Sequence, residues 1–285
     1  MLTEKYNPGR EKEIDSQVWQ QVYHAALNLE WNNTVLNLVK KAKGPYKNRV
    51  IEMFSNQELE FSIDEDWCNY LYLNGIIDAK TKVEDNGQLY SYCMFSCPFV
   101  QRRLFNEFSK EFFESRSSVL ALHPLDELSD VFLDKGLDLP ALLRRYQDYL
   151  KRLEEKGLSP WQGQPRRSDL HLTEAVGHFH LYAWLRQAVG KLCLVSPEFP
   201  TGNGKVDLFL RCKESQGIIE VKSYVDKMSL NQSKEQAAGY AHTLGLSEVT
   251  LAVFVPTRDE NILKELTCRE EHNTVLVNIV AIGWG

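Results

Sequence analysis

Hydrophobic residues recur at helical spacing near the start of the chain. Val18, Val22 and Leu29 fall on one face of a helix, and Val35 and Leu38 continue the pattern. An apolar face of this kind is typical of amphipathic helices that pack against a core. The pattern therefore predicts a helical region from about residue 15.

A further helix and a hairpin are predicted next. The carboxylates of residues 64–66 favour a helix start because they meet the positive end of the helix dipole, and Gly75 ends the helix. Residues 76–83 and 88–95 then read as two strands around Asn86-Gly87, a typical hairpin turn. Together with the helix that Pro98 opens, this order predicts a winged-helix-like element.

The best candidate boundary lies at residues 159–167, which are rich in Pro, Gly and Arg. A helix at residues 138–156, ended by Gly157, precedes it. We therefore expect three parts: a helical, winged-helix-like region at 1–115, a helical linker at 116–163 and a further domain at 164–285.

The last part has the element order of an α/β domain. A helix at residues 170–189, capped by Ser168 or Asp169, precedes strands at 192–199, 204–211 and 217–223. The capping box from Ser233 to Gln236 predicts a second helix to residue 244, and the apolar run 249–255 predicts a buried strand. Residues 274–282 are expected to add a strand, so the predicted fold class is α/β with an αβββαβ core.

Composition is that of a globular chain, with 43% hydrophobic and 25% charged residues, which argues against disorder. The net charge of −6 argues against an all-over attraction to nucleic acid and leaves that work to local basic patches. No stretch resembles a signal peptide or a membrane span, so we expect an intracellular, cytoplasmic protein without a membrane partner. The six cysteines are expected to be thiols.

Charged residues interrupt two of the predicted apolar strands. Asp207 lies in the strand at 204–211, and Glu220 and Lys222 lie in the strand at 217–223. Residues two apart on a strand project from the same face, and hairpin pairing brings Asp207 within their reach. Charges gathered in this way are costly unless they pair or bind a metal ion.

A hard divalent cation such as Mg²⁺ takes oxygen ligands from two facing carboxylates and relieves their repulsion. Bound there, it polarises a phosphodiester, helps to form hydroxide from water and stabilises the leaving oxygen. Lys222 beside that water would stabilise hydroxide and the negative charge that builds on phosphate. The three residues therefore predict metal-assisted hydrolysis of a phosphodiester.

At these residues the chain resembles the PD-(D/E)xK nuclease superfamily. Glu220-Val221-Lys222 matches its Glu-x-Lys motif, and Asp207 matches the preceding Asp, although Val206 stands where the motif has Pro. The resemblance covers roughly residues 168–255. It implies a restriction-endonuclease-like fold and a nuclease that uses Mg²⁺ or Mn²⁺, with DNA as the expected substrate.

The resemblance also implies roles for further residues. It implies that the metal ligands are Asp207, Glu220 and the carbonyl of Val221. Glu174 on the first helix matches a further residue that binds the metal or a water. Gln236 followed by Tyr240 matches a supporting pair on the second helix, with Tyr240 placed to contact nucleic acid.

Partners are implied as well. Arg166 and Arg167 precede the first helix of the domain, and we expect them to contact phosphates. The N-terminal region more loosely resembles the part that follows the ATPase core in prokaryotic proteins that join an AAA-type ATPase to such a nuclease. That likeness suggests an ATPase partner in trans.

Other interpretations stay open. The three charges also suit a structural salt-bridge cluster, or a degenerate nuclease fold that only binds nucleic acid or protein. Interaction with the helix dipole is a sufficient structural explanation for Glu174 near a helix start. The capping box with Ser233 is a sufficient structural explanation for Gln236. His178 lies one turn after Glu174 on the same helix face, where it could help to bind phosphate or shuttle protons, but a surface or packing histidine is the main expectation. The cysteines and histidines lack the spacing of a zinc site.

Overall fold

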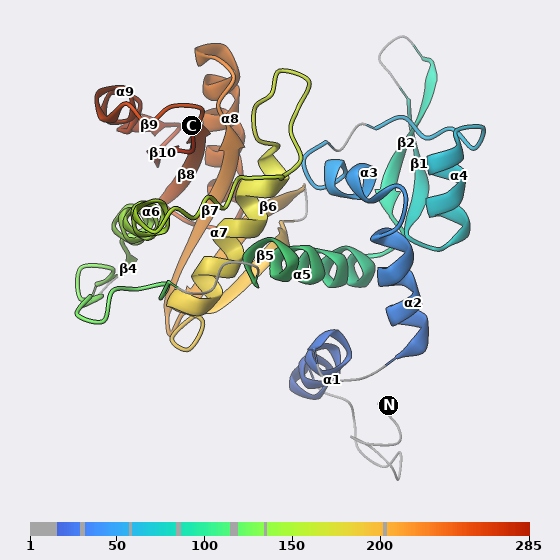
Figure 1. The fold of residues 1–285 in the computed structure, drawn as a ribbon, viewed down its shortest axis with the longest axis horizontal. Helices are drawn as coiled ribbons and strands as arrows, with labels where there is room; N and C mark the ends of the chain where they lie inside the picture. The colour runs from blue at the N-terminus through green and yellow to red at the C-terminus, as the bar shows by residue number, and fades with distance from the viewer. Residues whose placement is uncertain are drawn as a thin grey trace. The chain divides into compact units, whose positions relative to one another are not determined.

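A computed structural model of the chain describes residues 16–28, 32–56, 59–83, 87–114, 119–133, 136–201 and 204–285. The chain divides into two compact units, residues 1–107 and residues 108–285 (Figure 1). None of the helices in the described ranges is long and apolar enough to cross a membrane.

Helices followed by a hairpin form the first unit. Its elements are α1 (Ser16–Asn28), α2 (Asn33–Ala42), α3 (Lys47–Glu52), α4 (Asp66–Leu73), β1 (Ile77–Val83) and β2 (Leu89–Phe95), after which α5 (Pro98–Glu114) runs on into the second unit. The strands pair antiparallel from Ile77 beside Phe95 to Val83 beside Leu89, which confirms the predicted hairpin. Its turn residues 84–86 lie outside the described residues.

The second unit is built on a mixed sheet. Its elements are β3 (Phe132–Leu133), β4 (Gly136–Leu137), α6 (Leu139–Glu155), α7 (Glu174–Ala188), β5 (Leu194–Pro200), β6 (Lys205–Cys212), β7 (Ser215–Ser223), α8 (Lys227–Thr243), β8 (Glu248–Val255), α9 (Glu260–Leu266), β9 (Cys268–His272) and β10 (Val275–Gly283). Six of the strands form one sheet in the order β5-β6-β7-β8-β10-β9. β5, β6 and β7 are antiparallel neighbours, β8 runs parallel to β7 and β10, and β9 pairs antiparallel with β10.

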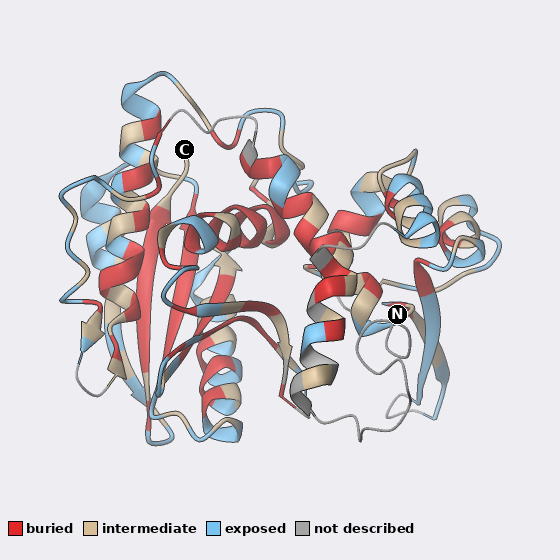
Figure 2. Ribbon diagram, turned by 90° about the horizontal axis from the view of Figure 1, so that it is seen from below, coloured by how far each residue is buried: buried red, intermediate tan, exposed pale blue. Residues whose placement is uncertain are grey.

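Helices cover both faces of this sheet. Successive residues of a strand point to opposite faces, and β8 shows this directly. Val253 packs in one apolar cluster with Ala238 of α8. The next residue, Phe254, faces the other layer, where it contacts Tyr146 of α6 and lies against Gly177 of α7. Buried residues, red in Figure 2, line the strands between these layers.

Most of the predicted elements are confirmed. The strands expected after residue 190 are present as β5, β6, β7, β8 and β10, and the fold is mixed α/β. The edge strand β9 and the short helix α9 were not predicted, because their sequences are charged and lack a clear period. The segment predicted as a linker contains α6, which packs on β8 and β10 and so belongs to the compact unit of the sheet.

Two predicted helix starts are wrong. α7 begins at Glu174 after Thr173, because Asp169 instead accepts a bond from the backbone N–H of His171 in the preceding loop. α8 begins at Lys227, because the Asp226 side chain caps it before the expected capping box is reached. Ser233 lies within the helix.

The expectation that the cysteines are all thiols is also wrong, since Cys193 and Cys212 form a disulfide. The antiparallel pairing of Leu194 with Arg211 brings the neighbouring cysteines to a Cα–Cα distance of 4.3 Å, close enough for their side chains to bond. The bond joins the ends of β5 and β6.

The close contact of α7 with β8 leads to a prediction about stability. A Cβ added at Gly177 would lie 2.7 Å from the ring of Phe254, so the helix and the sheet would have to move apart. We expect Gly177→Ala to lower the free energy of unfolding by about 1–3 kcal/mol, as overpacking does elsewhere. Denaturant unfolding measures this change.

Gly239→Ala is the matched control in α8. No described atom lies within 4 Å of the Cβ position at Gly239, and alanine favours a helix over glycine by about 0.5–1 kcal/mol. This control should be neutral or stabilising. Equal stability of the Gly177→Ala variant and the wild type would contradict the packing described for α7.

Candidate active site

Asp207 of β6 and Glu220 of β7 face each other across the hairpin. The pairing of Leu208 with Ile219 sets this register. The side chain of Glu220 accepts from the backbone N–H of Asp207 at 3.1 Å, and the side chain of Asp207 accepts from the backbone N–H of Val221 at 2.7 Å. Asp207 is 8% exposed and Glu220 is 2% exposed, so two buried carboxylates are fixed by reciprocal bonds to the backbone.

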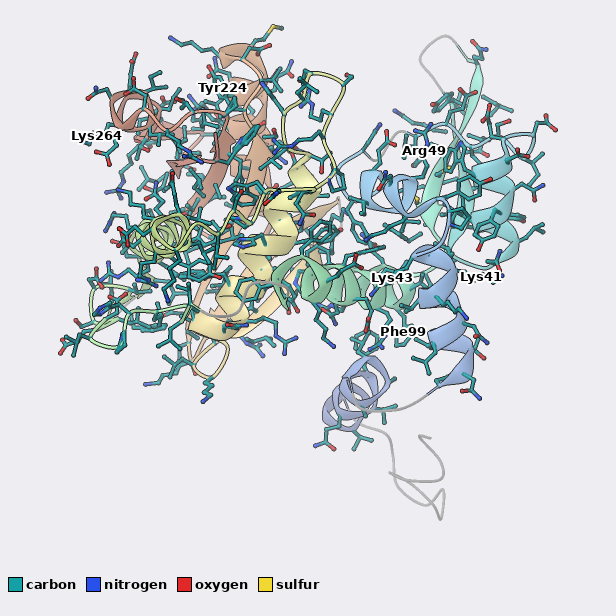
Figure 3. All side chains as sticks on the ribbon, viewed as in Figure 1. Lys41, Lys43, Arg49, Phe99, Tyr224 and Lys264 are labelled. Carbon is teal, nitrogen blue, oxygen red and sulfur yellow. A yellow bond between two sulfur atoms is a disulfide. The ribbon has the colours of Figure 1, made fainter. Side chains whose placement is uncertain are left out.

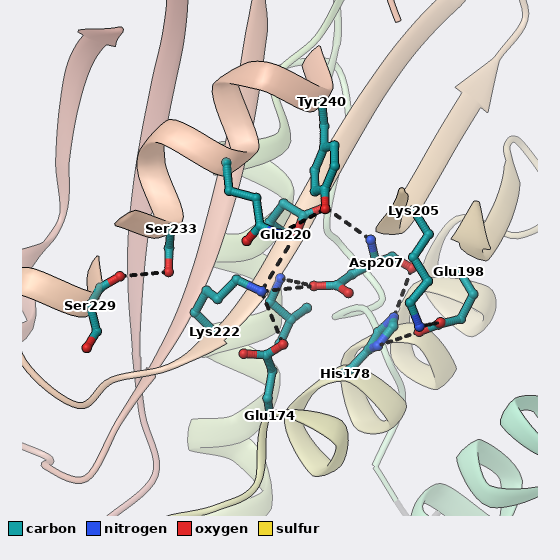
Figure 4. Close-up of polar contacts among 12 residues, drawn as sticks. Glu174, His178, Glu198, Lys205, Asp207, Glu220, Lys222, Ser229, Ser233 and Tyr240 are labelled. Atoms are coloured by element: carbon teal, nitrogen blue, oxygen red, sulfur yellow. Dashed lines mark hydrogen bonds and ion pairs between the residues drawn. The ribbon is translucent and has the colours of Figure 1, made fainter. Parts of the chain in front are cut away.

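Lys222 joins these carboxylates to α7. Its Nζ lies 3.1 Å from Oε1 of Glu174, and 3.8 Å from an oxygen of both Asp207 and Glu220 (Figure 4). The hydroxyl of Ser223 donates to the carbonyl of Leu172 at 2.9 Å, which ties the segment before α7 to the end of β7. The predicted cluster of Glu174, Asp207, Glu220 and Lys222 is therefore brought together.

The structure adds Glu198 and Lys205, which were not expected at the site, and it also places His178 there. Nε2 of His178 donates to the backbone carbonyl of Asp207 at 2.9 Å, and its Nδ1 lies 3.5 Å from Oε1 of Glu198. Lys205 forms an ion pair with Glu198 (Figure 4). His178 is 1% exposed, so it is a buried member of the site and not a surface histidine.

The pairing of β5 with β6 explains how Glu198 arrives there. Pro197 pairs with Leu208 and Phe199 with Val206, so that Glu198 stands opposite Asp207. The sequence indicated two successive strands here, but it did not indicate that Glu198 of the first stands opposite Asp207 of the second. The φ of 52° at Glu198 was not predictable, since this left-handed conformation is strained for a residue other than glycine.

Burial and charge together set the protonation states. Burial raises the pKa of Glu220 well above its usual range, with Asp207 adding to the effect, and lowers the pKa of His178 to about 4. Burial also raises the pKa of Glu174 to about 7, against the pull of Lys222. Burial alone would raise the pKa of Asp207. The charge of Lys222, the electrostatic effects of His178 and Lys205, and the hydrogen bond from the backbone N–H of Val221 outweigh burial, so the pKa of Asp207 falls below its usual value.

Lys222 is the cation of the cluster. Burial alone would lower the pKa of Lys222, but the three carboxylates raise it above the usual value. In the metal-free site these shifts favour the charged forms of Lys222 and Asp207 and the protonated form of Glu220. A cation that replaced the proton of Glu220 would gain a second charged ligand.

The donor set suits a hard divalent cation. Asp207 and Glu220 offer buried carboxylate oxygens on adjacent strands, and oxygen is the ligand type that Mg²⁺ and Mn²⁺ prefer. A second group, formed by His178, Glu198 and Asp207, offers ligand atoms that all lie within 4.8 Å of one another. Asp207 belongs to both groups.

The supporting residues from α8 lie beside the cluster. Gln236 donates to the hydroxyl of Tyr240 at 2.9 Å. Burial raises the pKa of Tyr240, and the charges of Glu220 and Lys222 act on it as well. A Cβ at Gly204 would lie 3.1 Å from the Tyr240 ring, so the tyrosine packs against the start of β6. Gln236 itself is exposed and meets the site only through Tyr240.

Arg166 and Arg167 already have partners within the second unit. The guanidinium of Arg166 lies 4.6 Å from the ring centroid of Trp284, and Arg167 forms an ion pair with Asp169 at 3.1 Å. In the described part of the chain neither arginine contacts the carboxylate cluster, and their contact with phosphate stays a prediction.

Basic residues of the first unit are engaged within that unit. Lys43 and Arg49, labelled in Figure 3, form ion pairs with Glu107 and Glu52 at 3.5 and 2.9 Å. These partners reduce the positive charge that the unit presents.

Comparison of the chain with models of known families, with curated proteins and with solved structures found no match. Its function is therefore inferred from the geometry of the site.

The raised pKa of Glu174 leads to a prediction for the metal-free protein. The unfolded chain releases this proton near pH 4.5 and the folded protein near pH 7. Between these values the folded state holds more protons, so the contribution of Glu174 to stability falls as pH rises. Glu174→Gln keeps a neutral side chain at every pH. The free energy of unfolding of this variant, relative to that of the wild type, should therefore rise by up to about 3 kcal/mol between pH 4.5 and pH 7.

Denaturant unfolding in EDTA across this range measures the difference. Glu265→Gln, at an exposed position on α9, is the control for the loss of one carboxylate from the chain. A difference between Glu174→Gln and the wild type that stays constant with pH would show that the folded protein does not hold the Glu174 carboxyl group protonated.

Proposed function

We propose that this protein is a metal-dependent nuclease of the PD-(D/E)xK type that hydrolyses phosphodiester bonds, with DNA as its substrate. The observation that carries the proposal is the convergence of Asp207, Glu220 and Lys222 from two adjacent strands with Glu174 of α7. Two carboxylates and an ammonium at one buried point are the groups that this reaction requires.

The fold supports the same proposal. α7, then β5, β6 and β7, then α8 and β8 reproduce the order helix, three strands, helix, strand, with the two helices on opposite faces of the sheet. The resemblance implies this same order for a restriction-endonuclease-like core, and we propose that β10 and β9 extend the sheet of such a core.

Asp207, Glu220 and the carbonyl of Val221 would hold Mg²⁺ or Mn²⁺, with Glu174 as a further ligand directly or through water. The metal supplies a charge that activates water and polarises phosphate. Lys222 stabilises the negative charge that develops on phosphate, in a position that its contacts with three carboxylates already fix.

Other residues hold the arrangement in place. His178 donates a hydrogen bond to the backbone carbonyl of Asp207. This bond holds the backbone of β6 in place at the residue that carries the carboxylate. Gln236 orients the hydroxyl of Tyr240 beside the cluster, where it can donate to a phosphate oxygen of the substrate. These residues position and bind, whereas Asp207, Glu220 and Lys222 act at the reacting phosphate.

A non-catalytic module that binds nucleic acid or protein is the second candidate. It is favoured by the fact that Lys222 alone already compensates the cluster, as a purely structural salt bridge would. Titration calorimetry with Mn²⁺ separates the two, because such a module has no reason to bind the ion at Asp207 and Glu220.

The winged-helix-like order of the first unit and an ATPase partner in trans are further proposals. They rest on the order of α2, α3, α4 and the β1–β2 hairpin, and on the resemblance to nucleases joined to AAA-type ATPases.

We predict that Asp207→Asn and Lys222→Ala each reduce metal-dependent DNA cleavage at least about 100-fold while the protein stays folded, since each removes a group that acts in the transition state. The assay incubates plasmid and single-stranded DNA with Mn²⁺, Mg²⁺ or EDTA, and circular dichroism checks the fold.

Lys227→Ala is the matched control for Lys222→Ala. Lys227 is an exposed lysine at the start of α8, and its loss should leave cleavage unchanged. Full activity in Asp207→Asn or Lys222→Ala would remove this cluster as the catalytic site. A wild type that neither cleaves nor binds Mn²⁺ would favour the binding module.

A further inference from the structure

A cavity lies in the unit that carries the sheet, apart from the candidate active site. It has a volume of about 1020 Å³ and is lined by α6 on one side, by α9 and the start of β9 on the other, and by β10, including Val280 and Ile282. Glu174, Asp207 and Lys222 are not among its lining residues. The cavity is therefore a separate feature of this unit.

The cavity reaches the same edge of the sheet as the active site. β7, β8 and β10 are parallel, so their carboxyl ends meet at one edge, where Lys222 pairs with Val253 and Gly283 pairs with Val255. Trp284, which follows β10, lines the cavity.

One loop, residues 166–172, joins the cavity to the candidate active site. Arg166 lies over the ring of Trp284 and forms a bridge with Leu172, and Leu172 in turn accepts a bond from Ser223, next to Lys222. The segment 166–172 thus runs from the cavity to the cluster.

Positive charge on the walls of the cavity is only partly neutralised. At the carboxyl end of the sheet the walls are bridged, since Lys151 of α6 pairs with Glu260 at 3.1 Å and Arg258 pairs with Glu154. Such exposed pairs contribute only about 0–1 kcal/mol each, so a charged ligand can displace them.

At the other end of the cavity the balance between positive and negative charge differs. Arg144 of α6 and Arg269 of β9 line the cavity, are exposed, and have no ion-pair partner in the described part of the chain. Lys264 of α9, labelled in Figure 3, lies on the same wall as Arg269. Asp148 also lines the cavity but makes no ion pair with these residues. Cations from opposite walls therefore face the space with an excess of positive charge, which an anion would neutralise.

We propose that this cavity binds the phosphate backbone of a single nucleic-acid strand outside the catalytic centre. The proposal rests on the proposed nuclease function and adds a site for the substrate. The lined stretch of β10 from Asn278 to Gly283 spans roughly 17 Å at about 3.4 Å per residue, which exceeds the reach of one phosphate. Arg144 and Arg269 bind the phosphates of the strand, above a floor in which Val280 and Ile282 are buried.

The test measures binding without catalysis. Fluorescence anisotropy of a labelled oligothymidylate, in EDTA, is compared for the wild type, Arg144→Glu and Arg269→Glu. Each variant should bind about tenfold more weakly, and the slope of log K against log salt should become shallower by about 1 for each cation removed. Arg211→Glu is the matched control, because Arg211 is an exposed arginine on strand β6 that does not line the cavity.

The outcomes separate this proposal from the nuclease itself. Arg144→Glu and Arg269→Glu variants that are folded and bind as tightly as Arg211→Glu would overturn the cavity as a strand site, even if the wild type cleaves DNA. Selective loss of binding in the two cavity variants would support the site, even if no cleavage were found. Thermal unfolding of each variant confirms that the change in binding does not come from a loss of fold.

Discussion

A single ammonium group, that of Lys222, is shared by three carboxylates inside the second unit, and the site depends on this interaction. Without it, Asp207 and Glu220 would be two buried acids facing each other across a hairpin, at a cost of several kcal/mol for each unpaired charge. The sheet holds both carboxylates by backbone bonds, and α7 begins where Glu174 meets the same lysine. The cluster is thus compensated in the metal-free protein yet keeps oxygen ligands that a divalent cation can take.

Much of this arrangement follows from the sequence, because strand periodicity is local. Glu220 and Lys222 share a face by their spacing of two, and the hairpin register brings Asp207 opposite. Glu198 was missed because its approach depends on a left-handed backbone conformation that no pattern signals. The predicted helix starts were wrong because two aspartates use other local hydrogen bonds than expected. Asp169 accepts from His171 in the loop before α7, and Asp226 caps α8 by accepting from Ser229. The disulfide was missed because it follows from strand register, whereas the expectation of thiols came from the compartment.

The proposed action on nucleic acid has to be compatible with a net charge of −6, and the charge distribution makes it so. At the candidate site the raised pKa values favour the protonated forms of Glu174 and Glu220, so these residues contribute less repulsion than their number suggests. The exposed Arg144 and Arg269 line the cavity that we propose as a strand site, at the end away from the sheet edge where the candidate site lies. The proposed attraction is therefore local and is not spread over the surface.

The most direct test of the central claim is a crystal structure of the protein soaked with Mn²⁺, with anomalous diffraction recorded for the ion. The account predicts an anomalous peak bound by the carboxylates of Asp207 and Glu220, and no peak there in an Asp207→Asn crystal treated alike. An empty site in the wild type, with Lys222 still bonded to Glu174 and the ion bound elsewhere or nowhere, would contradict the account and leave the cluster as a structural salt bridge.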